Sequence, residues 1–121
     1  ELSGDVPAKD RAGIVRAFQT DPACRVLLGQ ITTGGLGITL TAASLVIYIS
    51  NTYSLEDRLQ SEDRCHRIGQ VKSVTYIDIM ATLTDGQPTV DRDVLEVLKS
   101  KEAFAREVSL ALLRKIEERH G

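Results

Sequence analysis

The sequence has no run of 18 apolar residues, few cysteines and little net charge. It also has no charged-then-apolar leader, so we expect neither a membrane span nor a signal peptide. Its two cysteines, Cys24 and Cys65, lie far apart without metal-type spacing, which favours a reduced intracellular setting and no zinc site. With a net charge of −2, any binding of nucleic acid must depend on a local basic patch.

Two familiar phosphate-binding patterns are missing as well. The sequence contains neither a Gly-Lys-Ser/Thr string nor a G-x-G-x-x-G string, which are typical of Walker loops and of dinucleotide-binding folds. A glycine-rich turn in this chain can therefore contact a phosphate, but it cannot be the main nucleotide cradle.

The content of apolar residues, 42%, and of charged residues, 26%, is ordinary for a globular protein of one modest core. The first residue is not Met, and residues 1–5 read like the inside of a loop. We therefore expect a piece cut from a longer protein.

Hydrophobic periodicity and turn residues predict six elements. The order helix, strand, strand, helix, strand, helix is typical of an α/β fold with a mainly parallel sheet flanked by helices. The expected helices cover residues 8–19, about 55–67 and from 89 onward, and the expected strands cover residues 25–29, 45–50 and 74–80.

The first candidate motif is the glycine-rich stretch over residues 33–37, directly after an expected strand. Glycines allow tight turns, and the backbone amides of such turns can bind an anion. Thr32, Thr33 and Thr39 add hydroxyl groups. A tight strand-to-helix turn without any ligand would use glycine equally, and the pattern alone leaves both interpretations open.

The second candidate motif covers residues 60–70 and carries Arg64 and Arg67. In the expected helix the two arginines share a face, with Gln60 one turn earlier, and guanidinium groups pair phosphate oxygens bidentately. The alternative is a solvated helix with internal ion pairs. Because both motifs follow neighbouring parallel strands, we expect them on the same side of the domain. We interpret three other cations as plain surface charges: Arg25, Arg58 and Lys72.

Residues 34–43 and 60–70 resemble motifs V and VI of the Snf2 family of superfamily 2 helicase-like ATPases, and the string over residues 63–70 is specific to that family. The resemblance extends from about Leu2 to about Leu98. It implies a RecA-like second lobe of the P-loop NTPase type, truncated at its N-terminus. We expect this lobe over residues 1–100 and a C-terminal helical extension over residues 101–121.

The resemblance also implies a role for each matching residue. Arg64 and Arg67 match the catalytic arginines that reach ATP phosphates, with Arg67 as the first choice for the arginine finger. No residue matches a metal ligand. The implied ATP-binding residues are Gln60, Asp63, Gly35, Gly37 and Thr39, and the implied DNA-backbone contacts are Thr32, Thr33 and Gly34.

The function implied by the resemblance is that of the C-terminal motor lobe of a DNA-dependent ATPase that translocates on double-stranded DNA. ATP with Mg²⁺ would be shared with the N-terminal RecA-like lobe of the same protein, which would hold the metal, and the fragment alone would be inactive. We expect no membrane partner, self-association through an exposed sheet edge, and a cytoplasmic location in a bacterium or phage or a nuclear one in a eukaryote. The alternatives are a strand-separating helicase lobe and a non-catalytic nucleic-acid-binding module.

Overall fold

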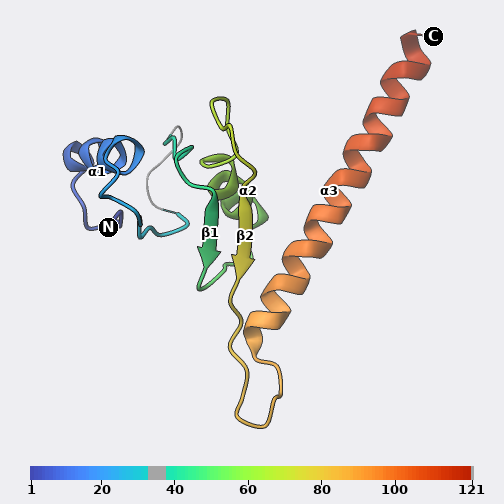
Figure 1. Ribbon diagram of the computed structural model, residues 1–121. Coiled ribbons are helices and arrows are strands. Elements are labelled where there is room, and N and C mark those ends of the chain that lie inside the picture. The colour runs from blue at the N-terminus through green and yellow to red at the C-terminus, as the bar shows by residue number, and fades with distance from the viewer. Residues whose placement is uncertain (33–37, 121) are drawn as a thin grey trace. The chain divides into compact units, whose positions relative to one another are not determined.

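The computed structural model describes residues 1–32 and 38–120 of the chain (Figure 1). These residues form two compact units, which are separate clusters of contacts. The first unit comprises Glu1–Ser50 and Glu56–Ile79, and the second comprises Asn51–Leu55 and Met80–Gly121.

The first unit is built around a two-stranded parallel sheet. Strand β1 (Leu45–Tyr48) pairs with β2 (Thr75–Asp78) in a register that places Leu45 opposite Thr75. Parallel neighbours need a crossover connection, and helix α2 (Leu55–Asp63) lies within it (Figure 1). Helix α1 (Ala8–Thr20) precedes the sheet in the chain. The α/β prediction and its parallel strand pair are confirmed.

The strand predicted over residues 25–29 is wrong. Gly29 forms only an isolated parallel bridge with Leu2, in which the Leu2 amide donates to the Leu28 carbonyl at 2.7 Å. A ladder needs several consecutive pairs, but the chain turns directly after Leu2, where the Val6 amide donates to the Ser3 carbonyl. The partner segment is therefore too short for a strand.

Arg58 fastens α2 to β2. Its guanidinium donates to Glu62 at 2.6 Å and to both carboxylate oxygens of Asp78 at 2.5 and 3.2 Å. It also lies over the ring of Tyr48, 3.7 Å from the ring centre. The side chain is only 12% exposed, so its interpretation as a plain surface charge is wrong. Burial alone would lower the pKa of Arg58, but the two carboxylates outweigh it and raise that pKa.

Two tyrosines add hydrogen bonds between the sheet and α2. The hydroxyl oxygens of Tyr48 and Ser61 are 2.6 Å apart, and the Tyr76 hydroxyl donates to the Glu62 carbonyl at 3.1 Å. Burial raises the pKa of Tyr48 and raises the pKa of Tyr76 to about 12. Both tyrosine hydroxyl groups therefore stay protonated at physiological pH. Together with Arg58, they hold α2 to the sheet through polar contacts.

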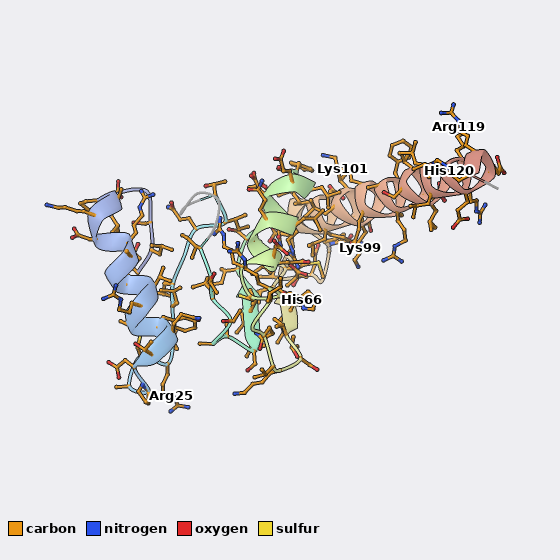
Figure 2. All side chains as sticks on the ribbon, turned by 90° about the horizontal axis from the view of Figure 1, so that it is seen from above. Arg25, His66, Lys99, Lys101, Arg119 and His120 are labelled. Atoms are coloured by element: carbon orange, nitrogen blue, oxygen red, sulfur yellow. The ribbon has the colours of Figure 1, made fainter. Side chains whose placement is uncertain are left out.

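The second unit is dominated by helix α3 (Val90–His120), which runs without a break through residue 100. Thr89 begins it, because its hydroxyl oxygen accepts a hydrogen bond from the Asp91 amide at 3.4 Å. Arg119 and His120 lie in the last turn (Figure 2), where positive charge suits the helix dipole. No helix among the described residues is both long enough and apolar enough to cross a membrane. A lobe boundary at residue 100 stays a prediction.

Replacing Arg58 with Met is expected to lower the free energy of unfolding by about 2 kcal/mol, because Asp78 and Glu62 lose their partner charge. Urea titration followed by circular dichroism measures the loss. Arg92→Met is the matched control: it breaks an exposed i, i+4 pair with Glu96 and should cost only about 0.3 kcal/mol. Equal losses in the two variants would contradict an anchoring role for Arg58.

Candidate functional site

The two motif arginines do not lie on a helix. Helix α2 ends at Asp63, and Arg64 and Arg67 lie in the turns that follow it. The prediction that they share a helical face is wrong. We call residues 64–70 the arginine turn.

A long-range hydrogen bond follows directly after the end of the helix. The carbonyl of Arg64 would accept from the amide of residue 68 in a continuing helix. Instead it accepts from the Leu40 amide at 2.7 Å. The amides of Cys65 and His66 both donate to the Glu62 carbonyl, and Gly69 takes a positive φ of 101°. The chain therefore leaves the helical path within one turn of Asp63.

The segment that supplies Leu40 also contacts the arginine side chain. We call residues 39–43 the threonine segment, which follows the glycine-rich stretch in sequence. Arg67 Nη1 donates to Thr39 Oγ1 at 3.3 Å. Arg67 is exposed and Arg64 is half-buried. The structure thus brings together Thr39, Arg64 and Arg67 among the predicted site residues, which supports the predicted proximity of the two motifs.

Gln70 completes the link between the arginine turn and the threonine segment. Its amide nitrogen donates to the carbonyls of Ala43 at 2.9 Å and Cys65 at 3.0 Å. Its amide oxygen accepts from the Lys72 amide at 3.0 Å. One side chain therefore fixes three backbone positions around the turn. Gln70 lies in the motif over residues 60–70, but the sequence pattern predicted no role for it.

Gln19 holds the threonine segment and was missed by sequence reasoning. It lies near the end of α1, where its amide nitrogen donates to Thr41 Oγ1 at 3.0 Å and its amide oxygen accepts from the Ala42 amide at 2.8 Å. The signal available in the sequence was weak: a polar residue beside Phe18 at the end of an amphipathic helix.

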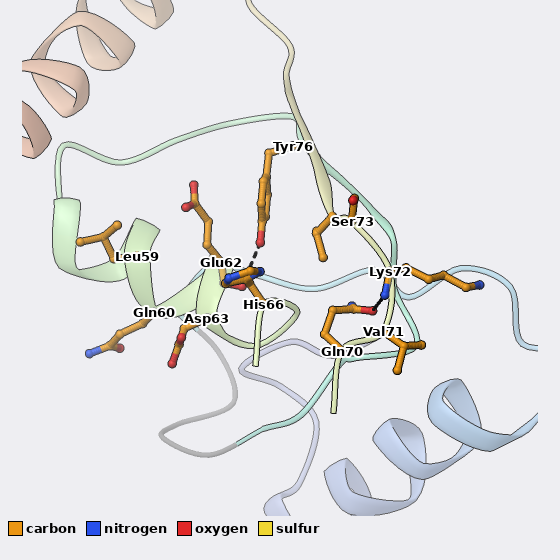
Figure 3. Close-up of a pocket in the computed structure, with 11 residues that line it drawn as sticks. Leu59, Gln60, Glu62, Asp63, His66, Gln70, Val71, Lys72, Ser73 and Tyr76 are labelled. Carbon is orange, nitrogen blue, oxygen red and sulfur yellow. Dashed lines mark hydrogen bonds between the residues drawn. The ribbon is translucent and has the colours of Figure 1, made fainter. Parts of the chain in front are cut away.

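Gln60 and Asp63 line a different feature, an open pocket of about 950 Å³ between α2 and the segment that leads into β2 (Figure 3). Arg64 and Arg67 are not among the residues that line it. Gln60 donates to Glu56 at 3.1 Å, a bond on the helix surface. The described residues among the predicted ATP-binding set are therefore divided between this pocket, with Gln60 and Asp63, and the threonine segment, with Thr39.

The remaining predicted site residues are only partly described. Thr32 is exposed and lies in a turn. The others, Thr33, Gly34, Gly35 and Gly37, lie outside the described residues, so their predicted contacts stay predictions. Within residues 1–32 and 38–120, no group of three or more His, Cys, Asp or Glu side chains could hold a metal ion.

Cys65 should resist alkylation in the folded chain. The side chain is buried at 4% exposure, and burial raises the pKa of its thiol although the charge of Arg64 opposes the shift. Because the thiolate is the reactive form, iodoacetamide at about pH 8 should modify Cys24 first and Cys65 only after denaturation. Peptide mass spectrometry measures both sites, and half-buried Cys24 is the internal control. Equal rates in the folded chain would show that the arginine turn is open.

Comparison with known proteins identifies relatives of this chain. The family model "Helicase conserved C-terminal domain" matches residues 1–69, a range that includes the threonine segment and nearly all of the arginine turn. The human lymphoid-specific helicase is 38% identical over 91 residues, which are 75% of this chain and 11% of that protein. The chromatin-remodeling ATPase INO80 of Cryptococcus neoformans is 34% identical over 100 residues, 83% of this chain and 5% of that protein.

A solved structure of another ATPase domain has a similar fold. The crystal structure of the C-terminal part of the Fun30 ATPase domain superposes with a TM-score of 0.67 at 26% identity, covering 80% of this chain and 30% of that one. The chain therefore spans only a small part of the length of these two relatives and of this solved chain.

Proposed function

The chain belongs to the helicase conserved C-terminal domain family, in its Snf2 branch, and on this premise we propose that it is the second motor lobe of a DNA-dependent ATPase. The observation that carries the proposal is the position of Arg67. Its guanidinium is exposed beside the threonine segment, and Thr39 is its one hydrogen-bond acceptor among the described residues. A guanidinium has five N–H donors, so Arg67 retains the capacity to bind phosphate oxygens.

In this proposal the arginine turn supplies positive charge to the phosphates of ATP bound mainly by the N-terminal lobe. Arg67 acts as the arginine finger and Arg64 assists it, because both stabilise the charge that develops on the transferring phosphoryl group. Thr39 fixes the direction of the Arg67 side chain. Gln60 contributes to nucleotide binding, and Asp63 orients an arginine rather than acting as a base.

Mg²⁺ would neutralise the β- and γ-phosphate oxygens when bound. We assign its ligands to the N-terminal lobe, because the part of the chain that the structure describes has no cluster of three or more potential ligand side chains. The glycine-rich stretch, with Gly35 and Gly37, would shape the backbone next to the nucleotide.

We further propose double-stranded DNA as the polymer that this motor contacts. The candidate contacts are Thr32, Thr33 and Gly34, which precede the threonine segment. INO80, one of the relatives, is described as a chromatin-remodeling ATPase, which favours duplex DNA as the track and a nuclear location if the host is a eukaryote. In a bacterium or phage the same motor would be cytoplasmic.

The alternatives have less support. A strand-separating helicase lobe is disfavoured by the string over residues 63–70, which is typical of the Snf2 branch. An autonomous nucleic-acid-binding module is disfavoured by the net charge of −2, since phosphate binding needs an excess of positive charge. Self-association stays a proposal that depends on the outer edges of the sheet, which have no strand partner among the described residues.

Arg67→Ala should reduce DNA-stimulated ATP hydrolysis by about a thousandfold or more in the two-lobe protein, in which this chain is joined to its N-terminal lobe. The reason is the loss of charge at the transferring phosphoryl group. Steady-state phosphate release with saturating duplex DNA measures the effect. Arg25→Ala is the matched control, because Arg25 is an exposed arginine of the same unit (Figure 2) and should leave the rate unchanged. Normal turnover by Arg67→Ala would refute the finger role.

The isolated chain should hydrolyse no ATP, with or without duplex DNA, because it has no Walker loop and no metal-binding cluster among its described residues. Phosphate release by the purified chain, compared with the two-lobe protein at equal concentration, measures this. ATP hydrolysis that stays with the isolated chain through purification and is lost in its Arg67→Ala variant would contradict the proposal that the N-terminal lobe holds most of the nucleotide site.

A further inference from the structure

Every residue of the threonine segment takes part in a hydrogen bond that leaves the segment. On one side, Thr39 accepts from Arg67, the Leu40 amide donates to Arg64, and the Ala43 carbonyl accepts from Gln70. These three bonds reach the arginine turn. They place the Arg64 carbonyl and the Arg67 guanidinium at fixed points along residues 39–43.

On the other side, a single side chain of α1 holds the middle of the segment. Gln19 donates to Thr41 Oγ1 at 3.0 Å and accepts from the Ala42 amide at 2.8 Å, across 22 and 23 residues of sequence. The threonine segment therefore lies between Gln19 and the arginine turn. A shift of Gln19 would move the residues that position both arginines.

We propose that Gln19 is a positioning residue for the arginine turn. By holding Thr41 and Ala42, it fixes the position of the threonine segment. That segment in turn holds Arg64 through Leu40 and Arg67 through Thr39. The proposal rests on the proposed function, since it gives the arginines their role. It adds a residue of α1, outside both motif strings, to the machinery that orients the finger.

The contact requires a side chain at position 19 with one hydrogen-bond donor, for Thr41 Oγ1, and one acceptor, for the Ala42 amide. A side chain with two acceptors also suffices if the Thr41 hydroxyl rotates to become the donor. A primary amide offers both groups. Glutamate at this position would still accept from the Ala42 amide, and the Thr41 hydroxyl can rotate to donate to the second carboxylate oxygen. Methionine matches glutamine in length but can replace neither bond. Gln19→Glu and Gln19→Met therefore separate the hydrogen bonds from the bulk of the side chain.

The test measures ATP hydrolysis by the two-lobe protein with duplex DNA. We expect Gln19→Met to lower kcat by about ten- to a hundredfold, with the KM for ATP changed less than about twofold, because a misplaced finger affects the transition state more than substrate binding. Gln19→Glu should retain a kcat near that of the parent protein. Thr20→Val is the control: the Thr20 hydroxyl donates to Arg16 within α1, and its loss should leave kcat unchanged.

Hydrogen exchange of the same proteins gives a readout that does not depend on turnover. In Gln19→Met, peptides covering residues 39–43 should exchange about tenfold faster, as expected for the loss of about one hydrogen bond. Peptides of α3 should be unchanged. Gln19→Glu and Thr20→Val should both keep the parent exchange rates.

The outcomes distinguish this inference from the proposed function. If Arg67→Ala abolishes turnover while Gln19→Met keeps the parent kcat and exchange rates, the role of Gln19 is refuted and the finger stands. A loss in Gln19→Glu or Thr20→Val as large as that in Gln19→Met would also refute it, by showing a general effect of altering α1. If Arg67→Ala is fully active, the finger role of Arg67 is refuted. The positioning role of Gln19 is then refuted as well, because there is no finger to position. Faster exchange in Gln19→Met would in that case show only that Gln19 holds the threonine segment.

Discussion

The hydrogen bond from the Leu40 amide to the Arg64 carbonyl is the constraint on which the rest of the site depends. A helix needs each carbonyl for the amide four residues later, and this carbonyl is already occupied by a residue 24 positions earlier in the chain, at 2.7 Å. Helix α2 ends at Asp63, and this bond holds the turn that follows against the threonine segment. The bond therefore sets where the backbone of the arginine turn lies relative to residues 39–43.

The constraint is effective because α2 is itself anchored. Arg58 bonds to Asp78 on β2 and lies over the ring of Tyr48 on β1, so the helix is tied to both strands of the sheet. Partly buried ion pairs contribute little net stability compared with apolar packing, but breaking one leaves an unpaired charge. Such a group fixes orientation more than it adds stability. Here it fixes the direction in which α2 delivers the arginine turn.

Two glutamine side chains fix further parts of the site through hydrogen bonds. Gln70 joins the end of the arginine turn to Ala43, and Gln19 joins α1 to Thr41 and Ala42. Arg67 remains exposed at this junction, and its guanidinium contacts Thr39. A cation that its neighbours already hold in place suits electrostatic catalysis, since the charge need not reorganise when the reaction occurs.

Much of the fold could be predicted from local sequence patterns. The periodicity of residues 8–19, the apolar run from Leu45 and the capping Thr89 gave α1, β1 and α3, and the family of the chain followed from the string over residues 63–70. The features that could not be predicted depend on contacts between distant residues. The backbone of Arg64 is bonded to Leu40, 24 residues away, and the side chain of Arg58 is bonded to Asp78, 20 residues away.

The site shows the same division between local and distant information. The proximity of Thr39 to Arg67 could be expected from the order of strands and motifs, because both motifs follow neighbouring parallel strands. The contacts of Gln19 could not, because a glutamine near the end of an amphipathic helix carries no sign of its partner. The strand expected over residues 25–29 failed for a related reason: an apolar run forms a strand only if a neighbour offers several consecutive pairs, and among the described residues this run makes one isolated bridge, with Leu2.

The most direct test of the account is a crystal structure of the two-lobe protein with ADP, Mg²⁺ and a phosphoryl transition-state mimic such as aluminium fluoride. The account predicts that the Arg67 guanidinium donates to the mimic while the Leu40 amide still donates to the Arg64 carbonyl. A mimic bound beyond the reach of Arg67, or bound by Arg67 only after the Leu40–Arg64 hydrogen bond has broken, would contradict it.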